Sequence, residues 1–136
     1  SDPSREGVKT AVELAENFGA ELILVHVLPP LRSAAGATNV AGYYLPTVEE
    51  ELAVEAAGLA EDLLKEAVPE TITSGFRVLN GRPAEQIAGL AEKEKADLIV
   101  IATHGESNWK EMFTGSVTER VIRRAKCPVL AVTRRE

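Results

Sequence analysis

The chain lacks several features on which whole classes of protein depend. Its 136 residues include one cysteine, Cys127, so no internal disulfide and no cysteine cluster for zinc can form. A lone thiol suits a reducing compartment, and we expect the protein to be cytoplasmic. Aromatic residues make up 4% of the chain, which is too few for the stacking platforms that bind single-stranded nucleic acid.

Long apolar segments and excess positive charge are also missing. No apolar run approaches the roughly 18 residues of a membrane-spanning helix, and no signal-peptide pattern opens the chain. The 15 basic and 21 acidic residues give a net charge of −6, which disfavours a phosphate backbone or a membrane as partner. Because no H-E-x-x-H or G-x-S-x-G motif is present, we predict no catalytic residues.

The remaining composition, 45% apolar and 26% charged, is typical of a globular protein, and the length predicts one domain over residues 1–136. Segments with apolar residues at helical spacing alternate along the chain with short strand-like segments, which are nearly continuous apolar runs except at residues 72–79, where apolar and polar residues alternate. The predicted helices span residues 3–18, 47–67, 83–95 and 116–125, and the predicted strands span residues 21–28, 72–79, 98–102 and 128–133. One strand per helix predicts an α/β fold, an open parallel sheet with helices on both faces. The first helix has no strand before it.

Local signals refine these elements. Gly19 stands where a C-cap glycine belongs, and residues 31–46 are small and aperiodic, so we predict a loop there. Thr47 and Ser116, each followed three residues later by glutamate, predict capping boxes. His26 lies inside an apolar strand, where we expect a packed histidine rather than a ligand. The apolar stripe predicted for the second long helix consists of Val48, Leu52, Ala56, Leu59, Leu63 and Ala67.

The segment after the strand at 98–102 carries the clearest chemistry. Gly105 is followed by nine residues and then by Gly115-Ser116, which opens a helix. Glycines allow close approach of a ligand, and the free N–H groups of a helix start favour an anion, so this pattern can form a phosphate cradle. The alternative is a strand-to-helix loop in which the glycines relieve turn strain and the serine is only a cap.

These residues resemble the universal stress protein family, whose nucleotide-binding members carry G-x2-G-x9-G-[ST] at this place. The runs Gly81-Arg82-Pro83 and Cys127-Pro128-Val129, and others over nearly the whole chain, also resemble the family. The resemblance implies a Rossmann-like sheet of order 3-2-1-4-5 that binds ATP. The residues implied at the nucleotide are Val27 beside adenine; Ala102, Thr103, His104 and Gly105 near ribose and phosphates; and Gly115, Ser116 and Val117 around the phosphate tail.

The resemblance further implies Mg²⁺ or Mn²⁺ held through the nucleotide phosphates, and a role as a dimeric stress-response or regulatory module. Many members dimerise through the last strand, so we predict a homodimer with its contact in Val129–Thr133, because an apolar edge strand is usually paired or covered. A dimeric scaffold of the same family that binds no nucleotide, and a slow ATP hydrolase, are the alternatives.

The sequence departs from the family pattern at three places. Ala102 replaces the first glycine of the motif, and Glu106 adds a negative charge beside the cradle. The family's opening strand, with an Asp at its end, has no counterpart here. That strand is central, so the strands at 21–28 and 98–102 would stand two strand spacings apart, roughly 10 Å. We expect the natural protein to have this strand; a strand supplied by a partner chain and direct closure of the sheet are alternatives.

Overall fold

Helices and strands alternate along the part of the chain that the computed structural model describes, residues 2–30, 46–103 and 115–133. The elements are α1 (Asp2–Phe18), β1 (Leu22–Leu28), α2 (Pro46–Ala67), β2 (Ser74–Asn80), α3 (Pro83–Lys93), β3 (Ile99–Ala102), α4 (Ser116–Arg124) and β4 (Val129–Val132). Every predicted element is present, with ends that differ by at most two residues. The predicted loop at 31–46 lies outside the described residues except for Pro46, which begins α2.

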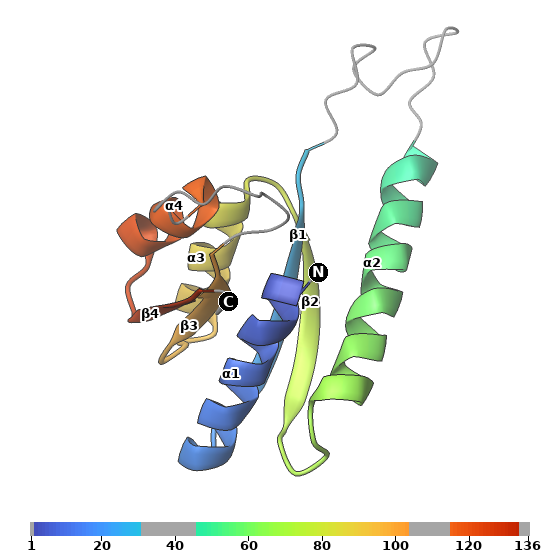
Figure 1. Ribbon diagram of the computed structural model, residues 1–136. Coiled ribbons are helices and arrows are strands. Elements are labelled where there is room, and N and C mark those ends of the chain that lie inside the picture. The colour runs from blue at the N-terminus through green and yellow to red at the C-terminus, as the bar shows by residue number, and fades with distance from the viewer. Residues whose placement is uncertain (1, 31–45, 104–114, 134–136) are drawn as a thin grey trace, which may run out of the picture.

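The strands form two parallel pairs. β1 pairs with β2 from Leu22 opposite Ser74, and β3 pairs with β4 from Ile99 opposite Val129. The order is β2-β1 in one pair and β3-β4 in the other, and no ladder joins β1 to β3 (Figure 1). The break falls at the place of the first strand in the order 3-2-1-4-5 that the family resemblance implies. Direct closure of the sheet is therefore excluded for the described residues.

The helices cover the strands from both faces, which confirms the predicted α/β class. On one side, α1, α2 and β1 contribute to one cluster, whose buried members are Val8, Val12, Ala15, Val68 and Ile72. On the other side, Ile99 and Ile101 of β3 join α3 and α4 around Val121, which is fully buried. Neighbouring Ala102 has the opposite orientation and meets α1, because successive residues of a strand point to opposite faces.

The buried face of α2 differs from the predicted stripe. Ala56 and Ala60 are buried, whereas Leu59 is 65% exposed and Leu52 is 37% exposed. Small alanine side chains let the helix axis approach the strands closely, so the helix rotates its alanines inward and leaves these leucines at the side. The C-terminal part of the stripe is correct, because Leu63 packs against the buried cluster.

The structure confirms one predicted helix cap and corrects two. Gly19 has a φ of +63°, and the N–H of Ala20 donates to the carbonyl of Ala15 at 3.0 Å, which closes α1 with a left-handed residue. The other two predicted caps are wrong. α2 begins at Pro46, one residue before Thr47, and Gly115 is the N-cap of α4, so Ser116 is its first helical residue.

β1 is less buried than its sequence predicts. Its sequence suggests a strand covered on both faces, yet none of its seven residues is buried and His26 is exposed. The prediction of a packed His26 is therefore wrong. The physical reason is that β1 has β2 on one edge and no paired strand on the other among the described residues.

Candidate functional site

The candidate site is at the carboxyl ends of the strands. β1, β2 and β3 are each followed by a helix, and the strands of each pair run parallel, so their carboxyl ends meet at one edge. Val27 is the second-last residue of β1, Ala102 ends β3, and Gly115 precedes α4. The residues that the sequence places at a nucleotide thus stand at the ends of three elements. His104 and Gly105 lie outside the described residues.

Gly115 leaves open space at the start of α4. Its φ of −51° and ψ of 158° suit any residue, so the backbone does not require glycine here. A Cβ built on Gly115 would meet no atom of the described residues within 4 Å. Neither the local conformation nor packing in this part of the chain therefore explains the glycine.

The first turn of α4 has N–H groups that are free to donate hydrogen bonds to a ligand. The first bond within this turn runs from the N–H of Glu119 to the carbonyl of Gly115 at 3.1 Å, so the preceding N–H groups have no acceptor inside the helix. Ser116 is exposed and does not cap the helix, which leaves its hydroxyl available to an anion. The carboxylate of Glu119 pairs with Arg123 at 2.9 Å, one turn further along, which offsets its negative charge.

Ala102, where the family motif has glycine, directs its methyl group toward α1. A Cβ built on Gly7 of that helix would lie 3.5 Å from the Cβ of Ala102, so the two positions pack together. The methyl group that β3 carries at this position therefore lies against α1.

Thr103 has a structural partner that the sequence does not reveal. Its side chain is 2% exposed, and both its N–H (3.0 Å) and its Oγ1 (3.3 Å) donate to the carbonyl oxygen of Val132. The hydroxyl therefore points to β4. Because this bond depends on the register that places Ala102 opposite Val132, only the tertiary structure could identify it.

Replacement of Thr103 by valine is expected to lower the free energy of unfolding by about 1 kcal/mol, the usual net value of one hydrogen bond. The loss stays small because the backbone N–H still donates to Val132. Urea unfolding measures it, with Thr71→Val, at an exposed residue outside β4, as the control. An unchanged midpoint in Thr103→Val would contradict a stabilising role of the hydroxyl.

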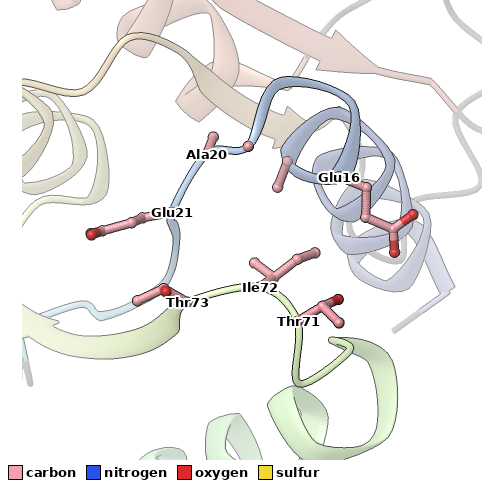
Figure 2. Close-up of a pocket in the computed structure, with 8 residues that line it drawn as sticks. Glu16, Ala20, Glu21, Thr71, Ile72 and Thr73 are labelled. Carbon is pink, nitrogen blue, oxygen red and sulfur yellow. The ribbon is translucent and has the colours of Figure 1, made fainter.

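Two cavities border the described residues away from α4. One of about 230 Å³ lies at the amino ends of β1 and β2, where Glu16, Glu21 and Thr73 border it (Figure 2). The other, of about 220 Å³, lies beyond the carboxyl ends of the same strands, between Pro30 and Leu52. Neither is lined by a residue that the sequence predicts at a nucleotide. The first cavity lies at the opposite end of β1 from Val27.

Basic residues near the end of α4 form ion pairs. Arg123 pairs with Glu119 at 2.9 Å, and Lys126 pairs with Glu92 at 3.0 Å. Arg124 lies 3.3 Å from a carboxylate oxygen of Glu85. Exposed pairs of this kind add little stability, but they offset the positive charge that a nucleic acid would need. Neighbouring glutamates thus offset the positive charges of Arg123, Arg124 and Lys126.

The described residues contain neither a metal-ligand cluster nor a membrane-spanning helix. No group of three or more His, Cys, Asp or Glu side chains in this part of the chain could hold a metal ion. No helix among residues 2–30, 46–103 and 115–133 is long and apolar enough to cross a membrane.

The chain is a doubly wound α/β protein, because its strands are parallel, helices cover both faces, and a helix with glycine as its N-cap begins at the carboxyl edge. The model of the universal stress protein family matches residues 1–133. The chain belongs to the universal stress protein family.

Individual relatives agree with this assignment. Universal stress protein MJ0531 of Methanocaldococcus jannaschii is 36% identical over 97% of this chain and 76% of its own length. Universal stress protein YxiE of Bacillus subtilis is 31% identical over 97% of this chain and 92% of its own.

Solved structures share the fold. The structure of protein MJ0577 superposes with a TM-score of 0.73 at 29% identity, covering 94% of this chain and 88% of that one. Among the sequence relatives, universal stress protein MJ0577 is from M. jannaschii. A universal stress protein in complex with cAMP matches with a TM-score of 0.63 at 28% identity, covering 98% of this chain and 89% of that one. At least one similar protein therefore holds an adenine nucleotide.

Proposed function

We propose that this chain binds ATP at the edge formed by the ends of β1 and β3 and the start of α4. The observation that carries the proposal is the open space at Gly115, directly before the free N–H groups of α4. A helix start of this kind favours a phosphate group. Membership of the family and the cAMP complex of a similar protein support an adenine nucleotide as the ligand.

Each predicted residue has a role in this proposal. Val27 lies beside adenine, and the segment from Ala102 to Gly105 approaches ribose and phosphates, with Thr103 contributing only its main chain because its hydroxyl bonds to Val132. Gly115, Ser116 and Val117 surround the phosphate tail. Mg²⁺ or Mn²⁺ would be held through the phosphate oxygens, since hard cations prefer oxygen ligands.

We further propose that the protein acts as a dimeric regulatory module in the cytoplasm and dimerises through β4. The carbonyls of Pro128 and Val132 accept hydrogen bonds from the N–H groups of Ile99, in β3, and Thr103, directly after it. Alternation along the strand then turns the N–H and C=O groups of Val129 and Ala131 to the free edge of β4. A second copy of the same edge can pair with them about a two-fold axis.

Calorimetric titration with ATP and Mg²⁺ tests the proposal, and binding at a single site per chain is the expected result. The same sample, assayed for released phosphate, is expected to give a turnover near the uncatalysed rate, because no general base is identified. Saturable binding supports the proposed function. Absence of binding favours the scaffold, and turnover that Ser116→Ala abolishes favours the hydrolase.

A further inference from the structure

β2 has a free edge in the part of the chain that the structure describes, because its only strand partner there is β1. At the two ends of this ladder, the carbonyl of Thr73 accepts from the N–H of Leu22 at 2.9 Å, and the N–H of Gly81 donates to Leu28 at 3.0 Å. Peptide groups alternate along a strand, so the odd-numbered residues of β2 bond to β1 and the even-numbered ones turn their N–H and C=O groups to the free edge. These outward residues are Ser74, Phe76, Val78 and Asn80.

The free edge of β2 is long and partly apolar. β2 has seven residues, against four in β4, and contains Phe76, Val78 and Leu79. An unpaired edge of this kind is a template for a strand of another chain, and proteins commonly block it with a proline, a bulge or a charged side chain. β2 contains no proline, and Arg77 is its only charged residue.

The side chain of Arg77 folds back over its own strand. Its Nη1 donates to the carbonyl oxygen of Phe76 at 3.0 Å, and that oxygen is one of the outward acceptors. The same nitrogen lies 3.7 Å from the place where a Cβ on Gly75 would stand. Nη2 lies 3.8 Å from a carboxylate oxygen of Glu94, the C-cap of α3. The guanidinium group therefore occupies the centre of the free edge.

A second copy of β2 fits this edge in one full register. Two antiparallel copies that use all four outward residues place Ser74 opposite Asn80 and Phe76 opposite Val78, with a two-fold axis at Arg77. Polar residues then meet polar residues, and apolar residues meet apolar ones. The two arginines stand directly opposite each other at the axis, where like charges destabilise a pair. The contact is complementary at every pair except the central one.

We propose that the free edge of β2 is a contact between copies of this chain that Arg77 holds closed. An incoming strand needs the carbonyl of Phe76 as an acceptor, and it meets the guanidinium group there instead. Once that group leaves, two copies pair through β2 about a two-fold axis. If copies also pair through β4, the two contacts together can link molecules into open chains, which Arg77 prevents. Closure of the β2 edge requires neither ATP binding nor pairing through β4.

Sedimentation velocity of Arg77→Ala tests this inference. The change removes the bond to Phe76 and the charge at the axis from both copies, and one hydrogen bond corresponds to roughly a factor of ten. We expect association through β2 to strengthen about 100-fold, so the variant forms larger species than the unchanged protein at the same concentration. Arg5→Ala is the matched control, because it removes an exposed arginine, paired with Glu66 at 2.9 Å, from α1. This control should sediment like the unchanged protein.

Amide exchange identifies the edge through which the variant associates. In associated Arg77→Ala, the outward N–H groups of Phe76 and Val78 should exchange more slowly, whereas those of Gly75 and Leu79, which face β1, should not change. Adding Val78→Pro removes an outward N–H and leaves the ladder with β1 intact, so it should abolish the association while circular dichroism stays unchanged.

Three results would overturn the closed-edge contact. The first is sedimentation of Arg77→Ala that matches the unchanged protein up to millimolar concentration. The second is larger species in which the exchange of Phe76 and Val78 is not slowed, because these would form through another surface. The third is equal association of Arg5→Ala, which would show that loss of any exposed arginine suffices.

Discussion

Gly115→Val is expected to abolish ATP binding and to leave the fold intact. The fold tolerates the change because the backbone at Gly115 is extended and its Cβ would meet no described atom within 4 Å. The ligand does not, because the valine methyl groups would occupy the space in which the phosphates approach the amides of α4. Loss of two charge-assisted hydrogen bonds, at ~1.5–3 kcal/mol each, raises the Kd by at least about 100-fold.

Calorimetry on the folded variant measures this change, and circular dichroism checks the fold. Gly58→Val is the matched control, since Gly58 also has open space around its Cβ but lies in the middle of α2. This control should bind ATP like the unchanged protein. Undiminished affinity in Gly115→Val would exclude a phosphate contact at the start of α4.

Leu130→Lys is expected to convert the dimer to monomers. Leu130 is 38% exposed at the centre of β4, where we propose that two copies pair. A two-fold contact contains the residue twice, and burying the exposed 38% of each leucine stabilises by about 0.6–1.1 kcal/mol. Their loss raises the dimer dissociation constant by about 10-fold, and two like charges placed close together raise it further.

Sedimentation equilibrium compares this variant with Ile122→Lys. Ile122 is 49% exposed on α4, so its replacement adds the same charge away from β4. The Ile122 variant should remain dimeric. If both variants sediment as the unchanged protein does, β4 is not the contact between copies.

The sequence predicts the elements well because each has a strong local signal. Continuous apolar runs mark β1, β3 and β4, alternation of apolar and polar residues marks β2, and the left-handed turn at Gly19 follows from its lack of a side chain. Helix orientation is harder to predict. Periodicity places Leu59 on the buried face of α2, but close packing of Ala56 and Ala60 turns it outward. The exposure of β1 cannot be predicted from the sequence either, because burial depends on which strands pair.

In the candidate site, too, the sequence predicts local features but not contacts that depend on the tertiary structure. Glycine and serine at the start of α4 are visible in the sequence, although Gly115 and not Ser116 proves to be the cap. The bond from the Thr103 hydroxyl to Val132 joins residues 29 positions apart and depends on the pairing of β3 with β4. Sequence patterns therefore locate the site but do not assign each side chain within it.

Thermal unfolding at increasing ATP concentration tests most directly whether the start of α4 receives a nucleotide. A ligand that binds only the folded chain stabilises it by mass action, by about 2.7 kcal/mol at 100 times the Kd. We predict that the melting temperature rises steadily with ATP and that Gly115→Val removes the rise. A melting temperature that stays constant up to millimolar ATP would contradict nucleotide binding.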